Sequence, residues 1–279
     1  MSYPPLGSYS QFRGSTGGPF PWGEGGRSSI AYGVDVLPDL IRGIRSLPEL
    51  AAQTARKAEP RAAVLACVYV LSSPEVVDAL LPLESCVVVD RQQNRLEEVQ
   101  RLQANGQPLS TLHLPGFDEI RLPNEDGSVP VIGPGTPLRE PVALGPVRAA
   151  GWRRSTARRD PRPYVHVKML VGGRTWVWED DWGQEGYHFT PLITWMGSAN
   201  WTKSAPSHLE FGLWSDDRAL LDRNTSFLLD VVRFSQPLSS VTAGPEPELV
   251  DALWDDAAFA DYYAEYGPWP DDDDDDPDL

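Results

Sequence analysis

Cysteine and long apolar runs are scarce in this chain of 279 residues. Its two cysteines, Cys67 and Cys86, each lie in a stretch that we predict to be a buried strand. We therefore expect two core thiols, and neither a disulfide framework nor a cysteine metal site. No apolar run approaches the length of a membrane span, and the N-terminus shows no charged-then-apolar signal pattern. These features predict a globular, cytoplasmic protein.

Lysine is also scarce, because the chain has only Lys57, Lys168 and Lys203 against 21 arginines. Arginine presents a planar fork of hydrogen-bond donors, whereas lysine is a compact point charge. The presence of lysine at position 168, in a chain that otherwise uses arginine, indicates that this position requires a compact ammonium group.

The negative charge is concentrated at the C-terminal end. The net charge is −16, but 14 of the 40 acidic residues follow Pro245, which leaves 26 acidic against 24 basic residues in the rest. A cluster of arginines precedes residue 166, opposed only by Asp160, and consists of Arg148, Arg153, Arg154, Arg158, Arg159 and Arg162. Because local fields steer ligands, an anionic substrate is compatible with this sequence. The acidic run at the C-terminus is either a solubility feature or a screen for this cluster.

Histidine is rare as well, yet one of the four histidines lies two residues from a lysine. The alternating run Val165 to Val171 predicts a strand, in which side chains at i and i+2 leave the same face. His166 and Lys168 should therefore point the same way. The opposite face carries Val165, Val167 and Met169. A nucleophile and a cation on one face suit the binding of a phosphate group.

A second motif, GSxN, follows about thirty residues later and is formed by Gly197, Ser198 and Asn200. HxK followed by GSxN resembles the signature of the phospholipase D superfamily. The resemblance covers roughly residues 36–235, although only the two motifs are specific. It implies an α/β fold, with a mixed sheet flanked by helices and one phospholipase D-like repeat per chain.

The resemblance also implies roles for the site residues. His166 would attack phosphorus and form a covalent phosphohistidine, while Glu210 would hold its ring through the other nitrogen. The catalytic residues implied are His166, Lys168, Asn200 and Glu210. Substrate binding is assigned to Ser198, Arg153 and Arg154. No metal ion or other cofactor is required for this chemistry.

A second histidine is needed to protonate the leaving oxygen and then to activate water. Superfamily members with a single motif build the site across a two-fold interface. This chain has one HxK motif, because His113, His188 and His208 each lack a lysine two positions later. We therefore predict a homodimer in which both His166 side chains face the two-fold axis.

Two departures from the family pattern leave alternatives open. Gly173 replaces the aspartate expected five residues after Lys168, and about fifteen residues, 174–189, are inserted between the motifs. The predicted function is a metal-independent nuclease, favoured by the arginine-rich approach to His166. The alternatives are a lipid hydrolase that uses the Trp-rich insertion as an interfacial surface, and an inactive subunit that binds nucleic acid or a partner protein.

Domain boundaries follow shifts in composition. Residues 1–28, which are rich in Gly, Ser and Pro, predict a flexible arm before the phospholipase D-like domain 29–245. Residues 246–270 predict a C-terminal helix, and 271–279 predict a disordered acidic tail. The Pro- and Gly-rich stretch 105–145 predicts a long loop inside the domain, either a lid or partner contact or a surface insertion.

Periodicity places the remaining elements. Helical spacing covers residues 37–57, with a break expected at Pro48, and also covers 90–103 and 219–234. A helix capped by Ser73, with Pro74 in its first turn, is expected to end near residue 83. Apolar runs predict strands at 62–71 and 86–89, and strands 174–178 and 192–196 should pair across the insertion.

Overall fold

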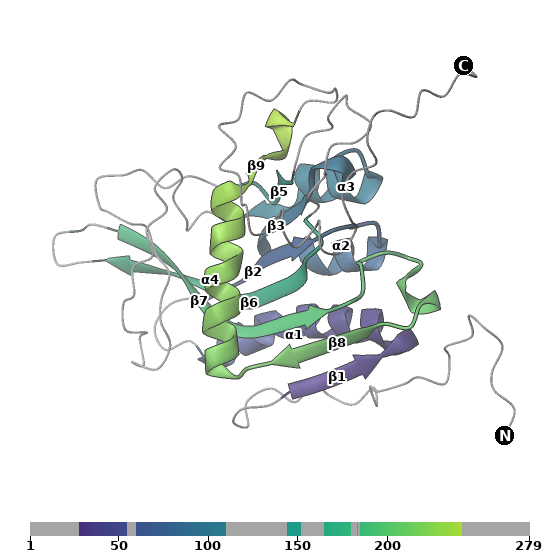
Figure 1. Ribbon diagram of the computed structural model, residues 1–279. Helices are drawn as coiled ribbons and strands as arrows, with labels where there is room; N and C mark the ends of the chain where they lie inside the picture. Colours follow the sequence, from purple (N-terminus) through teal and green to yellow (C-terminus); the bar gives the residue numbers. More distant parts are fainter. Residues whose placement is uncertain are drawn as a thin grey trace, which may run out of the picture. The chain divides into compact units, whose positions relative to one another are not determined.

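The computed structural model describes residues 28–54, 60–109, 144–151, 165–179, 183 and 185–241. Within this part of the chain, nine strands form one sheet in the order β1-β8-β7-β6-β2-β3-β5-β9, with β4 also paired to β3 (Figure 1). β3 is parallel to β2, β4 and β5, and the other neighbouring pairs are antiparallel. The predicted α/β class, a mixed sheet flanked by helices, is confirmed.

The elements alternate in the sequence as the periodicity predicted. The strands are β1 Ser28–Tyr32, β2 Arg61–Val68, β3 Glu84–Asp90, β4 Gln107–Pro108, β5 Val147–Ala150, β6 Lys168–Glu179, β7 Glu185–Gly197, β8 Phe211–Ser215 and β9 Gln236–Pro237. The helices are α1 Val36–Thr54, α2 Pro74–Leu80, α3 Glu97–Asn105 and α4 Arg218–Phe234. None of these helices, in the described part of the chain, is long and apolar enough to cross a membrane.

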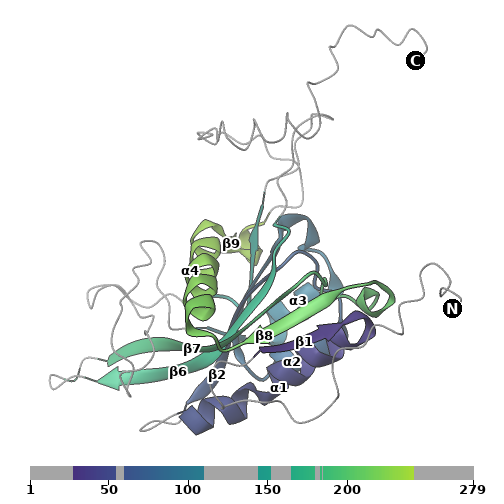
Figure 2. The same cartoon turned by 60° about the horizontal axis from the view of Figure 1, so that its bottom comes forward.

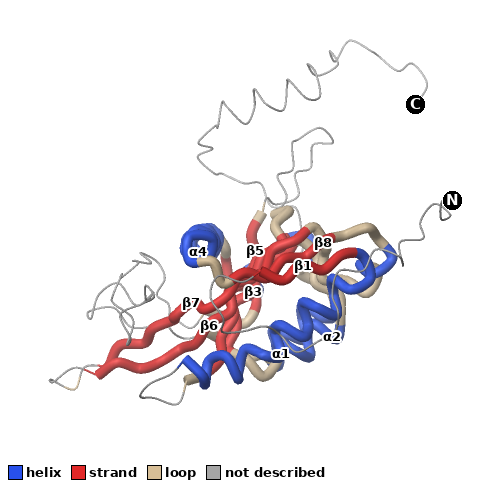
Figure 3. Tube along the Cα trace, turned by 90° about the horizontal axis from the view of Figure 1, so that it is seen from below, coloured by secondary structure: helices blue, strands red, loops and turns tan. Residues whose placement is uncertain are grey.

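Helices cover both faces of the sheet. Figure 3 shows α4 on one side of the strands and α1 and α2 on the other. β2 shows why the two layers form: Val64 and Ala66 pack in the core cluster that contains α1 and α2, whereas Leu65 and Cys67 pack in the cluster that contains α4. A strand buried on both faces is apolar at nearly every position. Cys67 and Cys86 are buried free thiols in these layers.

α1 is one continuous helix, so the break expected at Pro48 is wrong. An interior proline costs about 3 kcal/mol relative to alanine, because it removes a backbone donor and clashes with the preceding turn. Leu47 and Leu50, on either side of Pro48, are buried against the sheet. Burial of one leucine stabilises the fold by about 2 kcal/mol, so packing on both sides of Pro48 offsets the local cost.

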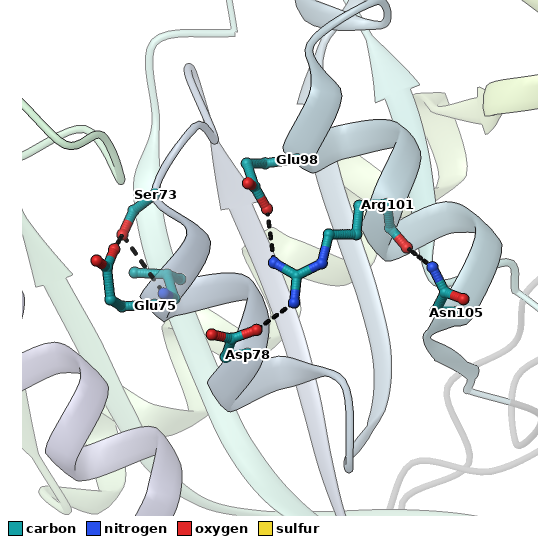
Figure 4. A network of polar contacts seen from close by, with 7 residues as sticks. Ser73, Glu75, Asp78, Glu98, Arg101 and Asn105 are labelled. Carbon is teal, nitrogen blue, oxygen red and sulfur yellow. Dashed lines mark hydrogen bonds and ion pairs between the residues drawn. The ribbon is translucent and has the colours of Figure 1, made fainter.

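α2 begins as the sequence predicted, because the Ser73 hydroxyl accepts a hydrogen bond from Val76 N at 3.4 Å and Pro74 follows it. The helix expected at 90–103 is partly wrong: residues 91–93 form a 3₁₀ turn, and α3 begins at Glu97. Arg101 of α3 binds Glu98 and also Asp78 of α2, which links the two helices (Figure 4). The pKa of Arg101 is raised above its usual value, chiefly by the hydrogen bond that its guanidinium donates to Asp78.

The insertion between the two motifs is an extension of the β6–β7 hairpin. β6 and β7 pair from Met169↔Met196 to Glu179↔Glu185, with one register shift between Gly172 and Gly173. Figure 2 shows this hairpin running out beyond the end of α1. The strands predicted at 174–178 and 192–196 are therefore parts of these two longer strands. The register of the site residues at the start of β6 and the end of β7 does not depend on the length of the extension.

α4 has the predicted bounds to within one residue, and Phe227 on this helix is 42% exposed. Leu221, Leu228 and Val232 pack into the second core layer. The predicted arm 1–28 lies outside the described residues except for Ser28, which begins β1. The predicted C-terminal helix 246–270, the acidic tail 271–279 and most of the loop 105–145 also lie outside them.

His188 of the hairpin gives the fold a sensitivity to acid. The ring is 2% exposed and stacks on Trp176, with 4.6 Å between the ring centroids. Burial lowers the pKa of His188 from 6.5 to about 4. Between pH 6.5 and 4 the unfolded chain therefore binds a proton that the folded chain does not bind, and stability falls as the pH falls.

We expect urea unfolding to show this loss. From pH 7 to pH 4 the wild-type chain should lose roughly 3 kcal/mol more free energy of unfolding than the variant His188→Phe. Phenylalanine keeps an aromatic ring on Trp176 and cannot take up a proton, while the other histidines are the same in both chains. Identical pH dependence in the two proteins would contradict this role of His188.

Candidate active site

The end of β2 and the start of β6 bring His166 and Lys168 together beside Tyr69. Val68 pairs with Lys168, and Tyr69 N donates a hydrogen bond to Val167 O at 3.0 Å. The Tyr69 and His166 rings meet edge to face, with centroids 5.2 Å apart and planes at 60°. The Lys168 Nζ lies 5.7 Å from the Tyr69 ring centroid. A histidine and a cation thus share one aromatic neighbour.

The predicted alternation of side chains is confirmed in this segment. Val165, Val167 and Met169 pack against the core layer of α4. His166 is exposed, whereas Lys168 is only 7% exposed and donates from Nζ to His166 O at 3.2 Å. The predicted start of the strand is three residues too early, because β6 begins at Lys168.

The GSxN motif forms the turn that leaves β7. Gly197 pairs with Gly212 of β8, and a Cβ at Gly197 would lie 2.4 Å from Phe211 O, so only glycine allows this approach. Ser198 N donates to Phe211 O at 3.0 Å, and Phe211 N donates to the Ser198 hydroxyl at 3.0 Å. The two hydrogen bonds fix Ser198 against the start of β8.

Glu210 is placed next to both motifs. The Ser198 hydroxyl donates to the Glu210 carboxylate, and Gly33 N donates to Glu210 O at 2.8 Å. Burial lowers the pKa of Lys168 below its usual value, while the negative charge of Glu210 opposes this shift. The expected contact of Glu210 with the His166 ring is not among the hydrogen bonds of the described residues, in which its carboxylate is bound by Ser198.

Asn200 lies in a segment that is held against the chain after β2. Trp201 N donates to Val70 O at 3.1 Å, and Ser72 N and Ser73 N both donate to Trp201 O at 2.9 Å. The Asn200 Oδ1 is buried and has no hydrogen-bond partner among the described residues. A buried polar atom without a partner carries a desolvation cost. Rotation of the Asn200 side-chain amide by 180° would put the donor Nδ2 where the acceptor Oδ1 now lies.

No protein-family model matches the chain, and no curated protein matches it. Among solved structures, it is similar to a phospholipase D family member, Nuc from Salmonella typhimurium, with TM-score 0.42, 12% identity, and coverage of 76% of this chain and 97% of that one. The sequence motifs had predicted this likeness.

Two further solved structures are similar to the chain. NucT from Helicobacter pylori matches with TM-score 0.46 and 13% identity over 76% of this chain and 99% of that one. Polyphosphate kinase from Porphyromonas gingivalis matches with TM-score 0.35 and 10% identity over 79% of this chain and 27% of that one. At such identities and TM-scores, function has to be inferred from the residues of this chain itself.

Two residues beside His166 were missed by the sequence interpretation. Tyr69 follows directly on the buried strand β2, and Asp90 ends the buried strand β3. Asp90 accepts a hydrogen bond from Val165 N at 3.0 Å. Polar residues at the ends of apolar strands are a signal that was available in the sequence, because such strand ends in an α/β sheet often line a site.

Gly173, which stands where the family has an aspartate, is required by packing. A Cβ at this position would lie 2.2 Å from Thr190 O of β7 and 2.8 Å from the Phe189 ring. The register of β6 and β7 also shifts between Gly172 and Gly173. A side chain cannot be accommodated here without movement of β7. The remaining predicted site residues, Arg153 and Arg154, lie outside the described residues.

Proposed function

We propose that this chain hydrolyses phosphodiesters through a phosphohistidine intermediate, and that its substrate is nucleic acid. The observation that supports this proposal is the exposed His166 beside the nearly buried ammonium of Lys168, with both against Tyr69. An accessible imidazole nitrogen can attack phosphorus, and a partly desolvated cation stabilises charge on the phosphoryl oxygens more strongly than it does in water.

The proposed reaction has two steps. A neutral nitrogen of His166 forms a bond to phosphorus as the bond to the leaving oxygen breaks, and a second histidine gives its proton to that oxygen. The same histidine then takes a proton from water, whose oxygen attacks phosphorus and releases His166. Lys168 and Asn200 are assigned to the non-bridging oxygens, and Glu210 accepts the hydroxyl proton of Ser198 and holds Ser198 in place.

The substrate class is tested by offering alternatives side by side. We expect the protein to hydrolyse single-stranded DNA, double-stranded DNA or RNA, as well as bis(p-nitrophenyl) phosphate, with the rate unchanged in EDTA because the proposed nucleophile is an imidazole. Loss of activity in EDTA that a divalent ion restores would contradict metal independence. Hydrolysis of phosphatidylcholine vesicles alone would identify a lipid hydrolase. Binding of DNA or RNA without any turnover would identify an inactive subunit.

The second histidine is proposed to come from another copy of the chain. The sequence contains a single HxK motif, and exposed apolar side chains lie next to Ser198 and Glu210 in the pair Tyr32↔Phe211 and at Leu209. An exposed apolar patch beside an incomplete site is suited to a two-fold contact. A cytoplasmic location and a protein partner remain predictions.

Light scattering of the purified protein should give about twice the chain mass of 30.8 kDa. A mixture of His166→Asn and Lys168→Met chains should recover little activity, because every composite site lacks one of its parts. A strict monomer that turns over substrate would rule out a shared site.

A further inference from the structure

Asp90 holds a buried carboxylate at the point where three chain segments meet. The side chain is 2% exposed and ends β3. Its Oδ1 accepts a hydrogen bond from Gln92 N at 2.9 Å, which begins the 3₁₀ turn at residues 91–93. Its Oδ2 accepts from Val165 N at 3.0 Å, across 75 residues of sequence. The carboxylate therefore joins the end of β3 to the residue directly before His166.

The third segment is the end of β5, which pairs Ala150 with Asp90. Gly151 follows with φ of +96°, and a Cβ there would lie 2.9 Å from Asp90 Oδ2 and 3.5 Å from Val165 Cγ2. Glycine is thus required at 151 both by its backbone conformation and by the close approach of the carboxylate. The Asp90 carboxylate is therefore enclosed by Gly151, which follows β5, and by Val165, which precedes His166.

A carboxylate is better suited than an amide to this position. Two backbone N–H groups point at the side chain, and each needs an acceptor because a buried donor without a partner is costly. Aspartate offers two acceptor oxygens, whereas asparagine offers one oxygen and would turn its NH₂ group toward the other donor. The two backbone N–H donors, at Gln92 and Val165, therefore explain why residue 90 is an aspartate.

His166 depends on this anchor because residues 165–167 precede β6 and lack its strand ladder. On one side of His166, the Val165 amide is bound by Asp90. On the other, the Val167 carbonyl accepts from Tyr69 N at 3.0 Å. These two hydrogen bonds hold Val165 and Val167, the residues on either side of the histidine, and the Tyr69 ring then meets the imidazole edge to face.

We propose that Asp90 is a positioning residue, which sets the orientation of His166 through the Val165 amide. The inference rests on the proposed function in that His166 is taken as the nucleophile. Small displacements of a reacting group are known to reduce rates by about 10²-fold. Loss of the anchor should therefore lower kcat and leave KM almost unchanged, because Asp90 itself does not contact substrate.

The test compares three variants. Asp90→Ala removes both acceptor oxygens, and Asp90→Asn keeps one of them. Gly151→Ala leaves Asp90 in place but puts a methyl group against its carboxylate. We expect kcat to fall by about 10- to 100-fold in Asp90→Ala and Gly151→Ala, and by less in Asp90→Asn. The double variant Asp90→Ala/Gly151→Ala should be no slower than the slower single variant, since both disturb the same contact.

Asp217→Asn is the matched control, because the Asp217 carboxylate caps α4 by accepting from Leu220 N at 2.9 Å and has no contact with the His166 segment. It should leave kcat unchanged. A second readout is the NMR resonance of the His166 Cε1 proton, which lies in the ring current of Tyr69. This resonance should move in the Asp90 and Gly151 variants, while that of exposed His208 should not.

The NMR readout needs no substrate, so it separates this inference from the proposed function. If the wild-type chain hydrolyses no phosphodiester, the proposed function fails, and a His166 resonance that moves on substitution of Asp90 still supports the anchor. If folded Asp90→Ala keeps both the wild-type kcat and the wild-type His166 resonance, the positioning role is wrong. If Asp90→Ala does not fold, Asp90→Asn and Gly151→Ala decide the question by the same two measurements.

Discussion

Replacement of His166 by asparagine should reduce phosphodiester hydrolysis on the order of 10⁴-fold or more, because it removes the group that forms the covalent intermediate. His166 is exposed and packs only its edge against Tyr69, so asparagine at this position should leave the fold intact. The stability of the variant, measured by urea unfolding, should therefore match that of the wild type. Initial rates on bis(p-nitrophenyl) phosphate would measure the loss. A rapid quench in alkaline denaturant, which preserves the acid-labile bond between nitrogen and phosphorus, should trap a phosphohistidine from a radioactive diester only in the wild type.

His208→Asn is the matched control, since His208 is also exposed but lies outside both motifs. Its activity should be close to that of the wild type. A large loss in His208→Asn together with a monomeric mass would identify His208 as the second histidine and would contradict the shared site. Full activity in His166→Asn would overturn the proposed mechanism itself.

The parts of the fold that could be predicted from the sequence are those set by local periodicity. Apolar residues at every third or fourth position marked α1 and α4, and the apolar run of β2 indicated burial on both faces. The common face of His166 and Lys168 followed from the two-residue period of a strand. Each of these signals is contained within a few neighbouring residues.

The rest of the site depends on contacts between residues far apart in sequence. The hydrogen bond from Val165 to Asp90 spans 75 residues, and no single-sequence pattern indicates that the end of β3 meets the segment before β6. The glycine requirement at Gly43 is of the same kind, because it exists only when Trp214 of β8 packs on α1, 2.3 Å from where a Cβ would lie. Tertiary packing determines which residues are required at these positions, and it also keeps α1 continuous through Pro48.

Lys168→Met should lower kcat by about 10²- to 10³-fold, which is the usual effect of removing one donor that stabilises developing charge. Methionine has nearly the length of lysine and suits a site that is 7% exposed, so the loss should reflect the missing ammonium and not a cavity. Lys168→Arg should also be impaired, because a planar guanidinium is larger than the space held by a compact ammonium. Lys203→Met is the control, since Lys203 is exposed and has no place in the proposed chemistry.

The pH dependence of these variants distinguishes a charge that acts on substrate from one that supports the fold. Burial lowers the pKa of Lys168 below 10.5, against the opposing negative charge of Glu210. Lysine is active only while protonated, so wild-type kcat should fall as the pH rises through this lowered pKa, before an ordinary lysine would titrate. Lys168→Met carries no proton there, and its low kcat should not show this alkaline fall, whereas Lys203→Met should keep it. An alkaline fall of the same size in Lys168→Met would show that another group is responsible, and a variant that retained more than about a third of wild-type kcat would remove Lys168 from the catalytic residues.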